Sequence, residues 1–126
     1  MRLRVVGDAV LRQAARALKP GEAAKLWPLQ VAMRAALQAE NGRGIAAPQL
    51  GNVLRMFLLA PEHNTASSSS PTPHEALLVI NPRVIRRSRP WVPDWETCSS
   101  VPGLAASQPV CQSCHFWCAV SCAVGS

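Results

Sequence analysis

The residues of this sequence with the clearest chemical potential are its five cysteines, all of which follow Glu96. Thiolates are nucleophiles, and they bind soft or borderline metal ions such as iron(II) and zinc. A lone cysteine is more often a small buried apolar residue, so Cys98 needs a supporting motif before a metal role is assigned to it. The other four are close together: Cys111, Cys114, Cys118 and Cys122.

The stretch from Cys111 to Cys122 is compatible with several chemistries. Cys111 to His115 has the Cys-x-x-Cys-His spacing of a c-type haem attachment site, and the same side chains suit zinc. The cysteines could also pair as disulfides in an oxidising compartment. However, zinc sites usually draw their ligand pairs from separated turns, and neither a helix nor a second axial ligand accompanies the haem spacing. We therefore expect a divergent tail over residues 104–126, of the kind produced by an alternative exon, a frameshift or a truncated gene.

A second chemical signal is the segment 42–51, Gly-Arg-Gly-Ile-Ala-Ala-Pro-Gln-Leu-Gly. Gly42 and Gly44 let another backbone approach closely, and Gln49 offers an amide donor beside that approach. A helix cap, a tight turn and the start of a strand would use the same residues. The glycine spacing differs from that of a dinucleotide-binding loop, and the Gly-Lys-Ser/Thr ending of a phosphate loop is missing.

As a whole, segment 42–51 resembles the first motif of peptide deformylases, glycine-x-glycine-hydrophobic-alanine-alanine-x-glutamine. The resemblance covers roughly residues 5–103, because 6–12 are similar to the family's opening and 79–82 to its following strand. A second family motif is glutamate-glycine-cysteine-leucine-serine. The similar segment here is Glu96-Thr97-Cys98-Ser99-Ser100, with threonine in place of glycine and serine in place of leucine.

This resemblance implies a metal-dependent hydrolase that removes the formyl group from the N-terminal formylmethionine of nascent proteins. Cys98 would be the thiolate ligand of a divalent ion, iron(II) or zinc. The Gln49 side-chain amide and the backbone amide of Ser99 would stabilise the developing oxyanion. Arg43 stands where the family usually has an aliphatic residue of the methionine pocket. The substrate would add as an extended strand beside Gly42, Arg43, Gly44 and Ile45.

The family takes its other two metal ligands and its general base from a His-Glu-x-x-His helix, and the sequence contains no such pattern. Its histidines are His63, His74 and His115, none with another histidine four residues away. A bound water becomes a nucleophile only on a properly held ion, so we expect poor metal binding and activity near background. The alternatives are a non-catalytic, deformylase-derived peptide-binding or relic protein and a small cysteine-rich zinc-binding module.

Segment 42–51 must be positioned by a helix that precedes it. Apolar residues recur at three- and four-residue steps between Glu22 and Glu40, which predicts a helix with one buried face. Pro28 is best tolerated in a first turn, so the helix should begin near Trp27. It should end by residues 41–42, with Gly42 in the left-handed cap conformation. A short helix is expected over 11–18.

Strands are predicted on both sides of a polar insertion. Residues 53–60 and 77–80 have the length and residue types of buried strands, and 84–85 continue the second one after Pro82. Residues 61–76 are too polar and too rich in proline to pack, so they predict a surface insertion. Three further prolines predict an extended, irregular path around the second motif: Pro90, Pro93 and Pro102.

Together these elements predict an α+β fold in which antiparallel strands pack around a helix, as in deformylases but incomplete at the C-terminus. One deformylase-like domain would span residues 1–103, with the divergent tail after it. A sheet without the family's central helix would expose apolar surface, so we expect marginal stability and aggregation.

Charge and hydropathy limit the partners. A formal net charge of +6 favours weak association with anionic partners such as ribosomal RNA. The arginines clustered over 83–89 lack the features of a nucleic-acid module, so we expect a solvated face and no specific nucleic acid.

No apolar run approaches the roughly eighteen residues of a membrane span, and the start is neither a signal nor a transit peptide. We expect an intracellular protein of a bacterial cytoplasm or a mitochondrial or plastid interior, with formylated nascent peptides and the ribosome as partners.

Overall fold

The computed structural model describes the backbone of residues 2–60, 76–87, 91–111 and 114–121, and side chains as far as residue 110. The predicted insertion, apart from Ala76, lies outside the described residues. The elements are η1 (Ala9–Arg12), α1 (Glu22–Lys25), α2 (Trp27–Ala39), β1 (Gly44–Ala46), η2 (Ala47–Leu50), β2 (Met56–Leu59), β3 (Leu77–Arg87), β4 (Trp91–Thr97), β5 (Ala105–Cys111) and β6 (Cys114–Ser121), where η denotes a 3-10 helix.

Helix α2 begins at Trp27 with Pro28 in its first turn, as predicted. Its C-terminal cap differs from the prediction, because Asn41 and not Gly42 takes the left-handed conformation, with a φ of 47°. The Asn41 amide donates to the Gln38 carbonyl and the Gly42 amide to the Leu37 carbonyl, at 3.1 and 3.2 Å. This is the hydrogen-bond pattern of a Schellman motif, and asparagine tolerates the left-handed region better than most residues.

The main sheet has the strand order β1-β2-β3-β6, and the three described pairings are antiparallel. Helix α2 packs against β1 and β2, and the side chains between them form the core. The alternation of buried and more exposed residues along β2 is that of a strand with one covered face. The largest fully buried side chains are Met33, Met56, Leu58, Leu78 and Val79. The fold is α+β, as predicted.

Strand β3 continues past Pro82, as predicted, and it changes direction at Asn81. Asn81 has a φ of 51°, and the register against β6 shifts between Ile80 and Arg83. Its side chain is tied to the N-terminal arm, because Oδ1 accepts from the Leu18 amide and Nδ2 donates to the Leu18 carbonyl, at 2.8 and 3.0 Å. The first half of β3 is therefore held in the core, whereas the second half leaves it.

Two local predictions were wrong. The expected helix over 11–18 is replaced by the short η1, which Asp8 caps through the Val10 amide. The path leading to the second motif is extended, as predicted, but it is regular and not irregular, because it forms β4, paired over its whole length with β5. Pro93 lies opposite Pro109 in this register. Both strands of a two-stranded ribbon are edge strands, where a missing amide donor is tolerated.

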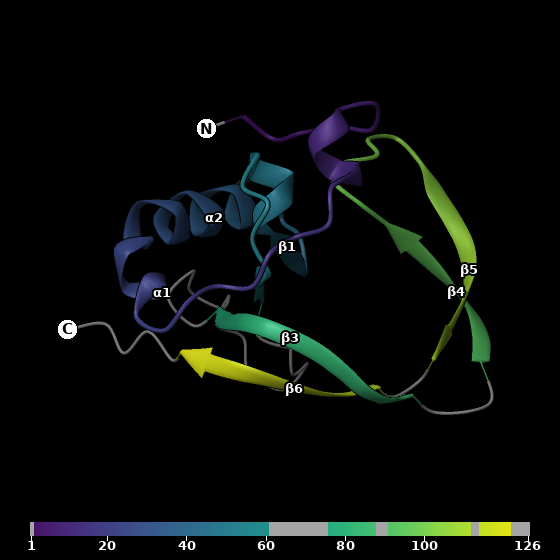
Figure 1. The fold of residues 1–126 in the computed structure, drawn as a ribbon. Helices are drawn as coiled ribbons and strands as arrows, with labels where there is room; N and C mark the ends of the chain where they lie inside the picture. The colour runs from purple at the N-terminus through teal and green to yellow at the C-terminus, as the bar shows by residue number, and fades with distance from the viewer. Residues whose placement is uncertain (1, 61–75, 88–90, 112–113, 122–126) are drawn as a thin grey trace, which may run out of the picture.

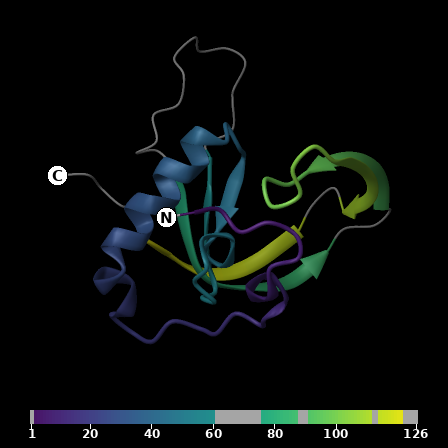
Figure 2. The ribbon, with the colours of Figure 1, turned by 90° about the horizontal axis from the view of Figure 1, so that it is seen from above.

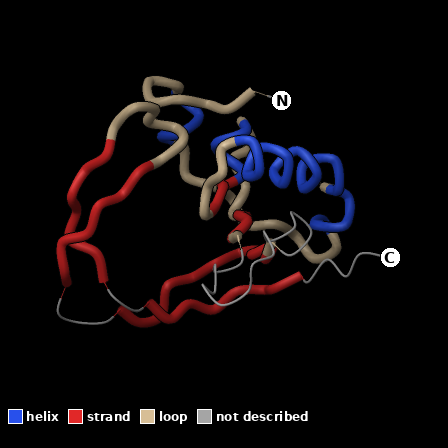
Figure 3. Tube along the Cα trace, turned by 180° about the vertical axis from the view of Figure 1, so that it is seen from behind, coloured by secondary structure: helices blue, strands red, loops and turns tan. Residues whose placement is uncertain are grey.

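The β4–β5 ribbon arches away from the core, as Figure 1 shows, and Figure 3 shows it from behind. Seen from above, it curls beside the outer end of β3 (Figure 2). Apolar side chains in this region are largely uncovered: Trp95 on β4 is 72% exposed, Leu104 just before β5 is 59% exposed, and Ile85 on β3 is 65% exposed. The Arg87 guanidinium lies 5.9 Å from the Trp91 ring centroid, so the arginine cluster has an aromatic neighbour that the sequence analysis did not anticipate.

Strand β6 brings the backbone of the cysteine-rich tail into the main sheet beside β3. The side chains from residue 111 onward lie outside the description, so the zinc, haem and disulfide alternatives stay predictions, as does the division at residue 103. In the part of the chain that the structure describes, no helix is both long and apolar enough to cross a membrane.

The exposed apolar side chains predict that the isolated chain aggregates on heating. Ile85→Thr should reduce light scattering with little change in melting temperature, because Ile85 is exposed. Leu58→Ala should cost about 2–5 kcal/mol of unfolding free energy, because Leu58 is fully buried. Melting followed by circular dichroism and light scattering at several protein concentrations tests both. A monomeric, cooperative transition of the unmodified chain well above room temperature would contradict the prediction.

Gly44 is required by the close pairing of β1 with β2. A Cβ built there would lie 3.0 Å from the Leu58 carbonyl oxygen, whereas one built at Gly42 would meet nothing closer than 3.7 Å. We therefore predict that Gly44→Ala lowers the unfolding free energy by about 1–3 kcal/mol. Gly42→Ala, in the same segment, should be close to neutral. Urea denaturation of both variants checks this, and equal effects would show that the β1–β2 contact is not the cause.

Candidate functional site

The Gln49 side chain is held in one orientation by two neighbours. It projects from η2, and its Oε1 accepts a hydrogen bond from the Ala46 amide at 2.8 Å. Because that amide can only donate, the other end of the Gln49 side chain must be its NH2 group. Nε2 donates to the Ser100 hydroxyl at 3.0 Å and lies 3.9 Å from Cys98 Sγ. The two sequence motifs therefore meet at this amide.

The turn that follows β4 presents the second motif. The Val101 amide donates to the Cys98 carbonyl at 2.8 Å, which closes the turn. Ser100 is buried, and its carbonyl accepts from the Val6 amide at 2.7 Å. The Arg4 amide donates to the Gln49 carbonyl at the same distance. One short N-terminal segment therefore bridges both motifs through its backbone.

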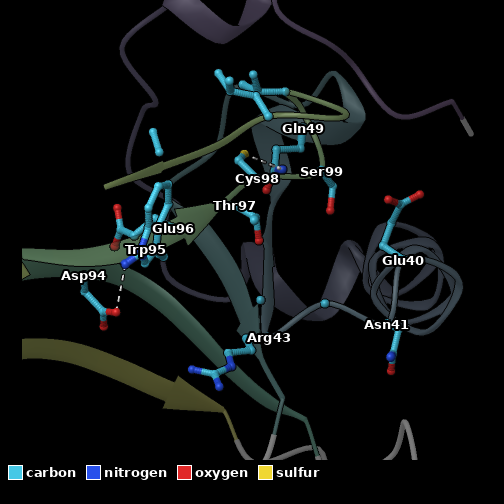
Figure 4. Close-up of a pocket in the computed structure, with 15 residues that line it drawn as sticks. Glu40, Asn41, Arg43, Gln49, Asp94, Trp95, Glu96, Thr97, Cys98 and Ser99 are labelled. Carbon is cyan, nitrogen blue, oxygen red and sulfur yellow. Dashed lines mark hydrogen bonds between the residues drawn. The ribbon is translucent and has the colours of Figure 1, made fainter. Parts of the chain in front are cut away.

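A cleft of about 930 Å³ opens between the C-terminal end of α2 and the end of β4. In Figure 4, Glu40 and Asn41 lie on one side, the residues of β4 on the other, and Gln49 with Cys98 at one end. Among the described residues its lining includes Gln49, Cys98, Ser99, Gly42, Arg43 and Gly44.

The structure separates one predicted site residue from the others. Ile45 is only 4% exposed and belongs to the hydrophobic core, so its side chain does not line the cleft. Its backbone lies in β1, the outermost strand of the main sheet, and no described strand pairs with the free edge of β1.

Two residues of the second motif are open to a ligand. Within the described residues the Ser99 amide donates no hydrogen bond to the protein. Cys98 is exposed.

Sequence reasoning missed the role of Ser100. It had matched this serine to the last position of the second motif without assigning it a contact. The structure gives Ser100 two contacts, one to the Gln49 side chain and one to the Val6 backbone. The signal was present in the sequence, since a small hydroxyl residue two positions after a candidate ligand cysteine is suited to fixing a neighbouring polar group.

The donors in the cleft do not fit a bound divalent ion. Structural and catalytic zinc sites use three or four protein ligands. Within the described residues, no three side chains of histidine, cysteine, aspartate or glutamate come close enough together to hold a metal. The sulfur of Cys98 has the Gln49 amide as its polar neighbour. His63 and His74 lie outside the described residues, as does the side chain of His115.

The hydrogen bond between Ser100 and Gln49 makes a testable prediction. Ser100→Ala should leave the Gln49 NH2 group with one partner fewer, which costs about 1 kcal/mol of unfolding free energy. The Gln49 side-chain NH2 resonances should shift in a nitrogen–proton NMR spectrum. Ser99→Ala, one residue away and lining the cleft, should leave those resonances in place. Unchanged Gln49 signals in Ser100→Ala would contradict the assigned contact.

The chain is similar in sequence to peptide deformylases. The family model described as polypeptide deformylase matches residues 1–109. Peptide deformylase 2 of Nostoc sp. is 33% identical over 104 residues, covering 82% of this chain and 58% of the relative. Peptide deformylase 2 of Shewanella oneidensis is 36% identical over 99 residues, covering 79% of this chain and 54% of the relative. The chain thus spans a little over half the length of these curated relatives.

Solved structures share the fold. A class I type b peptide deformylase from Acinetobacter baumannii with bound Met-Ala-Ser has a TM-score of 0.76 at 22% identity, covering 96% of this chain and 82% of the other. The peptide deformylase of Thermotoga maritima has a TM-score of 0.68 at 27% identity, covering 87% of this chain and 67% of the other. The sequence match over most of the chain, together with the common fold, shows that the chain belongs to the polypeptide deformylase family.

Proposed function

We propose that the cleft binds the formylated N-terminal methionine of nascent peptides, the substrate class of a deformylase. The observation that carries this proposal is the meeting of Gln49, Cys98 and Ser100 at one end of a cleft that also borders β1. An extended peptide would add to the free edge of β1 through main-chain hydrogen bonds. The formyl end would then lie against Gln49 and the turn after β4.

The formyl oxygen would be held by two donors. One is the Gln49 Nε2, whose 3.9 Å contact with Cys98 Sγ is long for a hydrogen bond and easily exchanged for a carbonyl oxygen. The other is the Ser99 backbone amide, which survives the change of side chain from the family's leucine. Donors of this kind stabilise charge that develops on an oxygen. They do not by themselves supply a nucleophile.

We further propose that this chain alone removes formyl groups near the background rate. The family is metal-dependent, with iron(II) or zinc as the expected ion, but among the described residues Cys98 is not part of any group of three histidine, cysteine, aspartate or glutamate side chains that could hold a metal. Without a held ion, water at neutral pH is a poor nucleophile. The chain would then bind formylated peptide without turning it over, inside a bacterial cytoplasm or an organelle where nascent chains leave the ribosome. In this proposal the deformylase-like unit is residues 1–103 and the tail is residues 104–126.

Peptide binding tests whether the cleft recognises the substrate, and formate release tests whether the chain turns it over. Formyl-Met-Ala-Ser is a suitable probe, because a solved relative binds Met-Ala-Ser. With iron(II), nickel or zinc supplied, we expect saturable binding and formate release no faster than in protein-free buffer. Gln49→Leu should weaken binding by about tenfold, since one hydrogen bond to the formyl oxygen is lost.

Acetyl-Met-Ala-Ser and a metal-free sample serve as controls. Formate release at an enzymatic rate would show that other donors complete the metal site, and the background-rate proposal would fall. If the protein is folded by circular dichroism but does not bind the formylated peptide, the proposal that the cleft binds this substrate is contradicted.

A further inference from the structure

Helix α2 turns polar side chains inward and apolar ones outward. Arg34 is the only charged residue within the helix, and it is buried, with Nη1 donating to the Ala76 carbonyl at 3.2 Å. Gln30, four residues earlier, is buried as well, and its Nε2 donates to the Ala23 carbonyl at 2.8 Å. A surface helix ordinarily places such residues on its solvent side, so the outer face of α2 is left without a charged group.

The outer face of α2 carries an apolar stripe. Trp27 is 57% exposed, Val31 is 46% exposed, and Ala35 is exposed too. Their four-residue spacing places them one above another along the helix, and we call these three residues the α2 stripe. Helix α2 packs on β1, β2 and η2 with its buried side, and Figure 1 shows the helix at the edge of the molecule. The stripe therefore faces away from the core.

The α2 stripe is complementary to itself when two copies pack their helices antiparallel. Trp27 and Ala35 each lie four residues from Val31. A two-fold axis at Val31 would therefore set the large Trp27 of each copy against the small Ala35 of the other, as in an isologous interface. Copies of a chain with a formal net charge of +6 repel each other, and the uncharged stripe is a face on which they can meet without bringing cations together.

The two ends of α2 carry opposite charges that fit the same arrangement. Lys25 lies just before the helix and Glu40 just after it, and both are exposed. Neither belongs to the two ion pairs of the described residues. In an antiparallel pair, Lys25 of each copy would lie near Glu40 of the other, whereas a parallel pair would bring like charges together. Antiparallel helix dipoles also attract each other.

We infer that two copies of the chain associate through the α2 stripe in an antiparallel, two-fold arrangement. This inference is independent of the proposed function, because it uses none of the residues assigned to the formyl group. A contact one helix wide and about 20 Å long is smaller than the roughly 800 Å² per partner of a standard interface. The dimer should therefore be weak, with a Kd of about 10–100 µM.

Sedimentation velocity of the whole chain, from well below to well above this Kd, measures the association. Val31→Lys brings two ammonium groups together at the two-fold axis and should raise the Kd by about tenfold or more. Val84→Lys is the matched control, because it makes the same substitution at a valine on β3 that is 51% exposed. Both variants add one positive charge, so general repulsion between copies rises equally. Val84→Lys should leave the Kd close to that of the unmodified chain.

Exchange of the end charges tests the antiparallel order. Lys25→Glu sets two carboxylates near each other at both ends of the helix pair. It should weaken association by about threefold at low ionic strength, although it lowers the net charge of the chain. Adding Glu40→Lys restores opposite charges and should restore the Kd. Both changes suit the dipole of α2, so circular dichroism should show unchanged helix content, as it should for Val31→Lys.

Three results would count against the dimer. A chain that stays monomeric at the highest concentration would overturn the inference. Equal weakening by Val31→Lys and Val84→Lys would also overturn it, because the contact would then lie elsewhere or depend on net charge alone. If the second charge exchange fails to restore the Kd, the antiparallel arrangement is overturned. A Kd that rises in Val31→Lys alone, and that the double exchange restores, would support the inference.

Discussion

The contact on which the candidate site depends is the side-chain amide of Gln49. Its oxygen is occupied by the backbone of β1 and its nitrogen by Ser100 in the turn after β4. The β4–β5 ribbon has its extensive contacts within itself, so the few polar links to this turn decide where Cys98 and Ser99 stand relative to the core. The N-terminal arm adds two backbone hydrogen bonds to the same junction. A short polar junction therefore sets the shape of the cleft, whereas the hydrophobic core sets only one of its walls.

The sequence was sufficient to predict the parts of the fold that depend on regular apolar spacing. Helix α2, β2 and the buried half of β3 all follow from such spacing, and the first motif identified the family. The prediction failed where backbone geometry overrides residue preference. Asn41 takes the cap conformation expected of Gly42, and β4 forms despite Pro93 because it is an edge strand, where a missing amide donor is tolerated. Pairing between distant strands, such as β3 with β6, leaves no periodic signal in either segment alone.

For the site, the sequence indicated which residues would converge but not what each would contact. The resemblance to the family motifs predicted that Gln49 and Cys98 would lie close together, and both line the cleft in the structure. Ser100 gained its importance from a hydrogen bond across 51 positions, which no local pattern predicts. The two sides of the cleft were equally hidden, because Glu40 follows the end of a helix and Asp94 lies in a strand, and only the fold brings them to the same cleft.

Gly44 belongs to the first motif for a reason that does not involve catalysis. Its lack of a side chain is demanded by the carbonyl oxygen of Leu58 on the neighbouring strand, a requirement of packing that exists whether or not any bond is ever hydrolysed. Natural selection for folding alone would keep this glycine in a lineage that had abandoned its reaction. The glycine of the first motif is thus explained by the pairing of β1 with β2, and a functional assignment has to come from the side chains that contact a ligand.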